Sequence, residues 1–195
     1  PQRVRPGQAV RIALHLEDPQ AGGQSLRMWK DYFYKGRIYS IDIYDKSPHQ
    51  QERIRIFQGS QADRGFLESV HRQTGDFDLI VDDGSHRNEH IVTSFEILFP
   101  KLKTGGIYAV EDIQTAYWPS YGGQQAPGSK GTAMSFFRKL ADGLNHAEYL
   151  LPEYEPSDYD LNILSLHFYH NMVVIQKGSN NVRSNLVIAG VLQPH

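Results

Sequence analysis

Short apolar runs alternate with segments of helical periodicity along most of this 195-residue chain, and this alternation restricts its fold more than any other feature. The predicted strands are residues 11–16, 37–44, 53–58, 77–81 and 106–110. The segments with helical spacing between them are residues 25–33, 62–74 and 87–98. Strands that alternate with helices of this length form right-handed β-α-β units around a parallel sheet. We therefore predict an α/β fold of the doubly wound, Rossmann-like type.

The C-terminal part of the chain departs from this rhythm. Residues 113–131 are rich in glycine, proline and aromatic residues, which predicts a lid or substrate loop. A helix is expected from 132 to 144. The apolar runs 163–169 and 172–176 are joined by two residues, which predicts an antiparallel hairpin at the sheet edge and seven strands in all. Residues 186–192 are expected to add a short edge strand.

Composition indicates one domain and excludes several functions. No repeat or linker divides residues 1–195, and the core is expected within 10–178. A formal charge of −2 argues against general binding to nucleic acid or to an anionic membrane. No apolar run approaches the roughly 20 residues of a membrane helix, and no secretory signal is visible. The absence of cysteine excludes disulfides, zinc–thiolate sites and thiol nucleophiles, and we expect a cytoplasmic protein.

Acidic residues follow two of the predicted strands. The motif 82–86 (Asp-Asp-Gly-Ser-His) comes after the run 77–81, and Glu111-Asp112 comes after the run 106–110. In an open α/β sheet the carboxyl ends of the strands line the crevice where ligands bind. Carboxylates crowded there repel one another unless a cation lies among them, and oxygen ligands suit a hard divalent cation. His86 is placed to move a proton beside that cation.

Other charged residues have simpler interpretations. One of the two consecutive residues Asp82 and Asp83 must point away from the crevice, so Asp82 is either structural or a cofactor contact. The pairs Asp45-Lys46 and Asp63-Arg64 are expected to be solvated surface charges.

The order of strands, the acid that ends the second strand and the terminal hairpin resemble the class I S-adenosylmethionine-dependent methyltransferases. More narrowly, the chain is similar to the metal-dependent macrolide sugar O-methyltransferases of the mycinamicin and demethylmacrocin type. The similarity extends from about residue 10 to 178. The blocks that carry it are residues 22–33, 41–46, 82–86, 111–112, 115–119 and 167–171.

The resemblance implies a role for each matching residue. Asp83, Glu111 and Asp112 would be the Mg²⁺ ligands, and His86 would be the catalytic base. Asp42 would bind the ribose hydroxyls of S-adenosyl-L-methionine, as acids at this position do in other dinucleotide-type folds. Further cofactor contacts are expected from Glu17, Ser25, Gly59, Ser60, Gln61 and Asp82.

Two of these expectations have qualifications. Ser25 is predicted to cap its helix, whose N-terminus would also attract the cofactor carboxylate. Aromatic and histidine side chains could either contact a sugar substrate or pack against the core. The substrate candidates are Tyr117, Trp118, Tyr121, His167 and Tyr169.

The chain departs from the family pattern directly after Glu17. Family members have a glycine-rich turn there, which cradles the methionine end of the cofactor, whereas Asp18-Pro19 follows at once in this chain. Either the turn is naturally shortened, or the native protein carries a segment that this sequence does not include. A measured mass well above 22.2 kDa would identify the second case. If the turn is truly short, weaker cofactor binding is expected.

The resemblance implies an Mg²⁺-dependent O-methyltransferase that methylates a hydroxyl on a sugar of a macrolide-like glycosylated natural product. Related enzymes are homo-oligomers, so a homo-oligomer is expected. Two alternatives stay open: a non-catalytic binding or assembly subunit with the same fold, and a metal-dependent hydrolase or hydroxylase that uses the same acids and histidine. Binding of S-adenosylmethionine or its demethylated product would discriminate between them. The sequence does not identify the acceptor, the position methylated or the subunit number.

Overall fold

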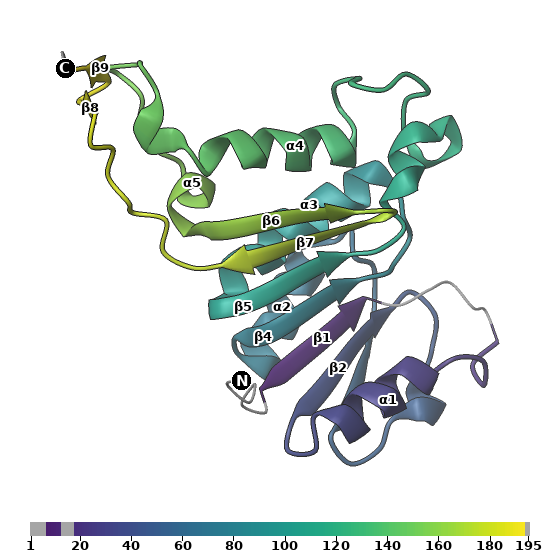
Figure 1. Ribbon diagram of the computed structural model, residues 1–195. Helices are drawn as coiled ribbons and strands as arrows, with labels where there is room; N and C mark the ends of the chain where they lie inside the picture. Colours follow the sequence, from purple (N-terminus) through teal and green to yellow (C-terminus); the bar gives the residue numbers. More distant parts are fainter. Residues whose placement is uncertain (1–6, 13–17, 194–195) are drawn as a thin grey trace.

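Seven strands form one sheet in the computed structural model, which describes residues 7–12 and 18–193. The strand order is β3-β2-β1-β4-β5-β7-β6. The five parallel strands are β1 (Gln8–Ile12), β2 (Arg37–Asp42), β3 (Ile54–Gln58), β4 (Phe77–Asp82) and β5 (Leu102–Val110). The hairpin of β6 (Ile163–Tyr169) and β7 (Met172–Lys177) completes one edge, with β7 antiparallel to β5 (Figure 1). The predicted doubly wound fold with its terminal hairpin is confirmed.

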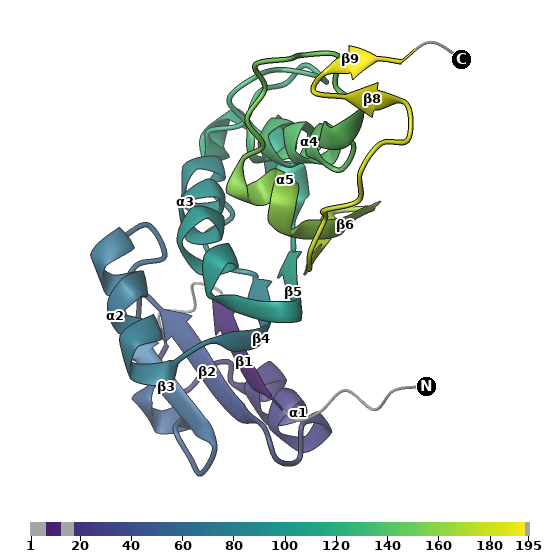
Figure 2. The ribbon, with the colours of Figure 1, turned by 90° about the vertical axis from the view of Figure 1, so that its left-hand side faces the viewer.

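The two faces of the sheet carry different numbers of helices. On one face α2 (Arg64–Thr74), α3 (Asn88–Leu98) and α4 (Ala133–Gly143) cover a large apolar core, with the short α5 (Asp158–Asn162) against α4 (Figure 2). On the other face α1 (Gln24–Tyr32) packs on β2 and β3 in a smaller core. The helices therefore cover one face of the sheet and only part of the other.

The remaining elements are short. They are the 3₁₀ helices η1 (Ser47–His49), η2 (Phe99–Lys101), η3 (Ile113–Tyr117), η4 (Pro119–Tyr121) and η5 (His146–Glu148), and the strands β8 (Val187–Ile188) and β9 (Val191–Leu192). The prediction that residues 186–192 form one edge strand is wrong. β8 and β9 pair only with each other, because Ala189 and Gly190 both take positive φ and reverse the chain between them. No helix among the described residues is long and apolar enough to span a membrane.

Candidate functional site

Two cavities lie at the carboxyl ends of β1, β2 and β4, where the strand order reverses. One cavity, of about 300 Å³, is lined by residues that include Gly23, Ser25 and Lys46. The other, of about 180 Å³, is lined by Gly59, Ser60 and Gln61 among others. Asp42 lines both. This is the switch point where doubly wound folds bind nucleotides, and Asp42 lies where the middle of an elongated ligand would be.

The carboxylate of Asp42 is held at the end of β2. Its side chain is almost fully buried, and Oδ1 accepts a hydrogen bond from the backbone N–H of Tyr44 at 2.9 Å. The carbonyl of Asp42 accepts from the N–H of Gly59 at 2.8 Å, which fixes β2 against the end of β3. The binding of a ribose by Asp42 remains a prediction.

The smaller cavity has an apolar and a polar side. Ile41 and Ile43 supply apolar wall, and His90, which sequence reasoning missed, lies on the polar side. A Cβ atom on Gly59 would lie 2.5 Å from the ring of Phe66, so only glycine fits between the cavity and α2. Gly59, Ser60 and Gln61 thus line this cavity, and their contact with adenine remains a prediction.

The start of α1 differs from the prediction. Ser25 is not the N-cap: Gly23 is, with φ of 77°, and it makes no side-chain capping bond. This left-handed conformation suits glycine and not serine. Ser25 is in the first turn of the helix and lines the larger cavity. Its proximity to a cofactor remains a prediction. Glu17 lies outside the described residues.

Lys46 is buried, which corrects the expectation of a solvated surface charge. Its side chain is 6% exposed. Nζ donates hydrogen bonds to the carbonyl of Asp18 at 2.6 Å and to that of Ala21 at 3.2 Å. Lys46 therefore ties the segment before α1 to the end of β2, beside the larger cavity.

Asp82 belongs to a buried polar network on the helix-covered side of the sheet. Its carboxylate is 1% exposed and accepts hydrogen bonds from the side chains of Gln61, Ser94 and Tyr108. Burial raises the pKa of Asp82 to about 6. Asp82 lines neither cavity, so the predicted cofactor contact is not supported and the structural alternative is favoured. The cause is strand geometry, because consecutive side chains point to opposite faces.

Asp83 instead faces the crevice. One carboxylate oxygen pairs with the guanidinium of Arg11 on β1, and the other lies 3.9 Å from Nε2 of His86. Oδ2 of Asp112 lies 3.7 Å from the same nitrogen. Within the described residues, one ligand atom each from Asp83, His86 and Asp112 lies within 4.8 Å of the others. Asp83, His86 and Asp112 thus form a cluster that suits a metal ion.

Glu111 is close to this cluster without belonging to it. Burial raises the pKa of its carboxyl, and the negative charge of Asp83 raises it further, while Arg11 opposes the shift. The predicted convergence of Asp83, Glu111 and Asp112 is thus found for two of the three, with His86 in the third place. Glu111 and Asp112 are consecutive, so the backbone aims them differently, and the role of Glu111 as a ligand remains a prediction.

Two members of the cluster have an uncommon backbone conformation. His86 and Asp112 have φ of 54° and 53°, the left-handed region that residues other than glycine rarely adopt. Such strain persists only where the surrounding structure enforces it, and it is found at functional sites. Here it directs both side chains toward Asp83.

The donor set fits a hard divalent cation. Carboxylate oxygens of Asp83 and Asp112 are the ligands that Mg²⁺ prefers. Nε2 of His86 is buried, and it has no hydrogen-bond partner among the described residues. A buried nitrogen without a partner costs free energy unless a ligand or substrate satisfies it. The cluster can therefore bind a cation and present an imidazole beside it.

The substrate candidates surround this edge of the sheet. Tyr117 is the last residue of η3, Tyr121 is the last residue of η4, and Trp118 lies between these two helices. The rings of Trp118 and Tyr121 lie 5.8 Å apart. Tyr169 and His167 are near the end of β6, and their rings stack with centroids 6.4 Å apart. The N–H of Ile113 donates to the carbonyl of Asn171 at 3.1 Å, so the hairpin turn adjoins the end of β5. Tyr117, Trp118 and Tyr169 are exposed, and their contact with a substrate remains a prediction.

Sequence reasoning missed Arg11. Its guanidinium pairs with Asp83, 72 positions away in sequence, and its side chain also lines the larger cavity. Nε of Arg11 is buried without a partner among the described residues. A charged residue inside the first apolar run was the signal that could have identified it, because an unpaired charge is rarely buried in a parallel sheet.

A doubly wound sheet with an antiparallel terminal hairpin, two cavities that share Asp42 at its switch point and an acid–histidine cluster beside them is the arrangement expected of a methyltransferase domain of the α/β class. Residues 9–113, more than half of the chain, match the family model described as a methyltransferase domain. The chain belongs to this methyltransferase domain family.

Similar proteins are named as O-methyltransferases. The chain is 47% identical over 165 residues to mycinamicin VI 2''-O-methyltransferase of Micromonospora griseorubida, which covers 84% of this chain and 41% of that protein. It is 43% identical over 183 residues to a rhamnosyl tetracenomycin-C 2'-O-methyltransferase of Streptomyces olivaceus, covering 93% and 48%. The chain thus spans less than half the length of these relatives.

A solved structure has the same fold. A methyltransferase of the mycinamicin pathway, in complex with Mg, S-adenosylhomocysteine (SAH) and mycinamicin VI, superposes with a TM-score of 0.85 at 43% identity. The match covers 90% of this chain and 45% of that one.

Proposed function

We propose that this chain carries the catalytic part of an Mg²⁺-dependent O-methyltransferase, which transfers the methyl group of S-adenosylmethionine to a hydroxyl on the sugar of a macrolide-like glycoside. The cluster of Asp83, His86 and Asp112 beside the two cavities joined by Asp42 is the observation that carries the proposal. Support also comes from relatives whose names specify O-methylation of glycosylated macrolides and tetracenomycins.

The residues of the cluster would divide the chemistry between them. Asp83 and Asp112 hold the cation, with Glu111 as the third predicted ligand. A bound Mg²⁺ lowers the pKa of a coordinated hydroxyl by stabilising the alkoxide. His86 then accepts the hydroxyl proton at Nε2, the buried nitrogen that lacks a partner.

Arg11 and Asp42 would position the reactants. The pair with Arg11 orients the carboxylate of Asp83, so that the other oxygen faces His86. Asp42 holds the ribose, and residues 59–61 border the adenine in the smaller cavity. No covalent intermediate on the protein is required, so alignment and electrostatics supply most of the acceleration.

The acceptor would approach from the side of η3, η4 and the β6–β7 turn. Tyr117, Trp118, Tyr121, His167 and Tyr169 are the residues proposed to contact it. We also propose that the protein acts as a homo-oligomer, by analogy with the related enzymes.

Calorimetric titration with SAH, followed by a methyl-transfer assay on a macrolide glycoside, tests the proposal. We expect binding of SAH, transfer that requires Mg²⁺, and loss of transfer in His86→Ala with SAH binding retained. Absence of SAH binding would favour the hydrolase or the non-catalytic alternative. Full activity after treatment with a chelator would contradict the role of the metal.

A further inference from the structure

Asn88 is a buried polar residue at the start of α3, two positions after His86. It is 3% exposed and lines neither of the two cavities that share Asp42. A buried carboxamide costs free energy unless its polar groups are hydrogen-bonded. The partners of Asn88 therefore show what the residue does.

The carboxamide of Asn88 joins segments that are distant in sequence. Nδ2 donates hydrogen bonds to the carbonyl of Thr115 at 3.2 Å and to that of Tyr121 at 3.1 Å. Oδ1 accepts a hydrogen bond from the N–H of Ala133 at 2.7 Å. Two carbonyls need a donor and an N–H needs an acceptor, so these partners fix the orientation of the amide. Both N–H groups and the oxygen of the side chain are thus used within the protein.

The oxygen of Asn88 satisfies the start of α4 and not the start of its own helix. Ala133 is the first residue of α4, and the first N–H groups of a helix have no carbonyl partner within it. Thr132 supports the same end of α4, because its Oγ1 accepts from the N–H of Ser135 at 3.1 Å. The start of α4 therefore has two separate supports, of which Asn88 is one.

The nitrogen of Asn88 contacts both ends of residues 115–121, which we call the aromatic segment. Thr115 and Ala116 are buried, whereas Tyr117 and Trp118 are exposed. The rings of Trp118 and Tyr121 lie 5.8 Å apart. The aromatic segment is therefore anchored at its buried part and presents aromatic rings on its outer part.

Beyond Tyr121 the chain folds back onto the aromatic segment. The N–H of Gly123 donates to the carbonyl of Trp118 at 3.0 Å, and the N–H of Gln124 donates to that of Ala116 at 2.9 Å. A Cβ atom on Gly123 would lie 2.4 Å from the carbonyl oxygen of Thr115, so only glycine fits there. These bonds fix the shape of the loop, and the two bonds from Asn88 attach it to α3.

The aromatic segment and α3 each adjoin a member of the cation cluster. The segment begins three residues after Asp112, and Oγ1 of Thr115 donates to the carbonyl of Asp112 at 3.2 Å. α3 begins two residues after His86. Asn88 therefore sets where the aromatic rings lie relative to both residues.

We propose that Asn88 is a positioning residue for the acceptor. It holds the aromatic segment where Tyr117, Trp118 and Tyr121 contact the sugar, and it does not touch the acceptor itself. The inference rests on the proposed function, because it requires an acceptor on this side of the sheet. A released segment would bind the acceptor weakly, while the cluster and the cofactor cavities keep their places. Loss of Asn88 therefore raises the Michaelis constant for the acceptor more than it lowers the turnover number.

Three variants separate this role from a purely structural one. Asn88→Ala removes all three hydrogen bonds. Asn88→Asp keeps an acceptor for the N–H of Ala133, where the N-terminus of α4 favours a negative charge, but an ionised carboxylate cannot donate to Thr115 and Tyr121. Thr132→Ala is the matched control, because it weakens the same end of α4 and leaves the aromatic segment attached.

Steady-state kinetics with a macrolide glycoside measure the role. Both Asn88 variants should raise the Michaelis constant for the acceptor roughly tenfold or more, as expected for two lost hydrogen bonds. The turnover number should stay within about threefold of wild type and the dissociation constant for SAH within about twofold, because the loss is one of acceptor binding. Thr132→Ala should leave the Michaelis constant within about twofold, although loss of a helix cap lowers its melting temperature.

Hydrogen exchange of backbone amides tests the attachment of the loop without an acceptor. In both Asn88 variants the N–H groups of Trp118, Gly123 and Gln124 should exchange roughly tenfold faster than in wild type, because the loop opens more often. In Thr132→Ala the same groups should exchange at the wild-type rate.

Two results would overturn the inference. One is exchange at the wild-type rate throughout the loop in both Asn88 variants. The other is faster exchange with an unchanged Michaelis constant, which would leave Asn88 a structural role only. Failure of the proposed function gives a different result, since the wild-type protein would then transfer no methyl group, whatever the exchange rates are.

Discussion

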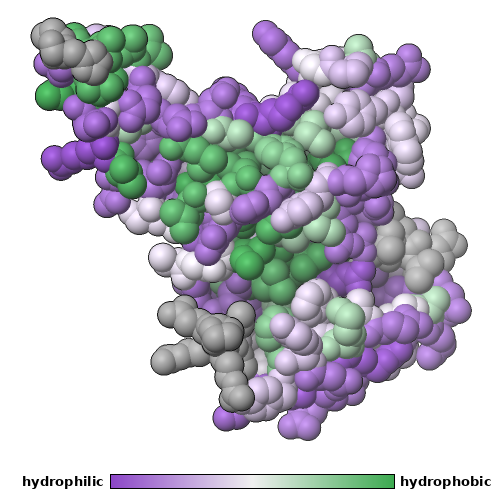
Figure 3. Space-filling view, in the orientation of Figure 1, coloured by the Kyte–Doolittle hydropathy of each residue, from purple (hydrophilic) through white to green (hydrophobic). Residues whose placement is uncertain are grey.

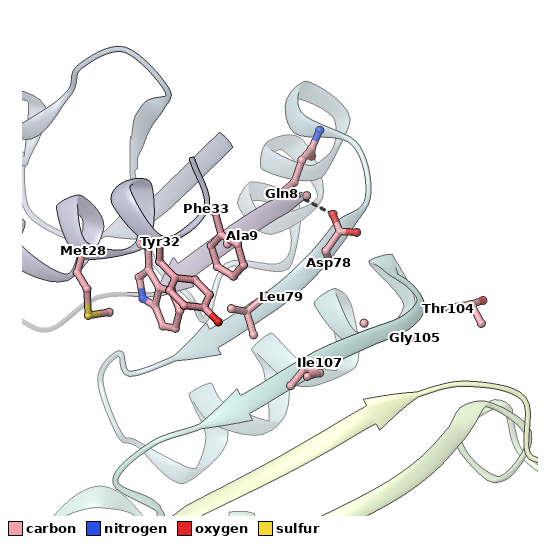
Figure 4. Close-up of a pocket in the computed structure, with 13 residues that line it drawn as sticks. Gln8, Ala9, Met28, Tyr32, Phe33, Asp78, Leu79, Thr104, Gly105 and Ile107 are labelled. Carbon is pink, nitrogen blue, oxygen red and sulfur yellow. Dashed lines mark hydrogen bonds between the residues drawn. The ribbon is translucent and has the colours of Figure 1, made fainter. Parts of the chain in front are cut away.

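The carboxyl edge of the sheet and the groove beside α1, which is lined by residues that include Ala9, Met28, Phe33, Leu79 and Ile107, both take residues from β4 and β5 or the loops after them but differ in chemistry. Hydrophobic residues gather near the centre of the face that holds the groove (Figure 3). At the edge, Asp83, His86 and Asp112 are charged or titratable, and two of them have a strained backbone. In the groove Ala9, Leu79 and Ile107 form an apolar row, and Asp78, the one charged residue of the described lining, is paired with Lys103 (Figure 4). The edge therefore has the features of a site for chemistry, and the groove has those of a surface for packing. Changes at the edge should alter catalysis, and changes in the groove should leave catalysis nearly unchanged.

The largest effect is expected from His86→Ala. Loss of a general base lowers the rate by roughly 10²- to 10⁴-fold. The turnover number at saturating S-adenosylmethionine and acceptor measures it. His71→Ala is the control, because His71 pairs with Asp76, at the opposite end of β4 from Asp83. An unchanged turnover number would remove His86 from the mechanism.

A smaller effect is expected on cofactor binding from Asp42→Asn. Hydrogen bonds to a charged group contribute about 1.5–3 kcal/mol, so the dissociation constant for SAH should rise by roughly 10- to 100-fold. Asp45→Asn is the matched control, because Asp45 is exposed and lines neither cavity. Calorimetry that finds equal affinities for wild type and Asp42→Asn would disprove the placement of the ribose.

The buried network at Asp82 predicts a pH dependence of stability. Burial raises the pKa of Asp82 from 3.8 to about 6, so the folded chain binds this proton more tightly than the unfolded chain. The contribution of Asp82 to the free energy of unfolding is fully present below about pH 4 and is lost as the pH rises through 6. The total loss is roughly 3 kcal/mol. Thermal unfolding in chelator should show this loss in wild type and not in Asp82→Asn.

Asp160 serves as a control, because its contribution to stability should change with pH in the opposite direction. Burial alone would raise its pKa, but hydrogen bonds from Tyr154 and Ser157 lower it. Its contribution to stability is therefore present near neutral pH and is lost as the pH falls through the folded-state pKa. If Asp82→Asn and Asp160→Asn changed the pH profile in the same direction, the assignment of Asp82 to a buried network would be wrong.

The smallest effect on activity is expected in the groove. Ile107→Ser in the 195-residue chain should leave methyl transfer within about twofold of wild type, as surface substitutions away from a site usually do. Trp118→Ala at the edge should raise the Michaelis constant for the acceptor roughly two- to tenfold, the value of one aromatic contact. A larger loss in Ile107→Ser than in Trp118→Ala would invalidate the contrast between edge and groove.

The sequence predicted the sheet because its signal is local. Apolar runs such as 37–44 and 77–81 alternate with segments of helical spacing, which restricts the topology strongly. The short pairing of β8 and β9 was missed because a run of seven residues does not reveal where positive φ will reverse it.

The site was predicted in part, and the errors have two causes. Motif and spacing brought Asp83, His86 and Asp112 to one edge, as the structure shows. The ion pair of Arg11 with Asp83 and the burial of Lys46 depend on contacts between residues far apart in sequence. The second cause is the pleat of the strand, which decides which of two adjacent acids faces the crevice. An error of one residue in the predicted end of the strand exchanges the two acids.

The central claim is that Asp83 and Asp112 bind a divalent cation beside His86. Titration of the metal-free protein with Mn²⁺, monitored by electron paramagnetic resonance, tests it most directly because the signal of free Mn²⁺ is lost on binding. The account predicts one site in wild type that Mg²⁺ displaces, and loss of this site in Asp83→Asn and in Asp112→Asn. Equal Mn²⁺ binding by wild type and both variants would contradict it.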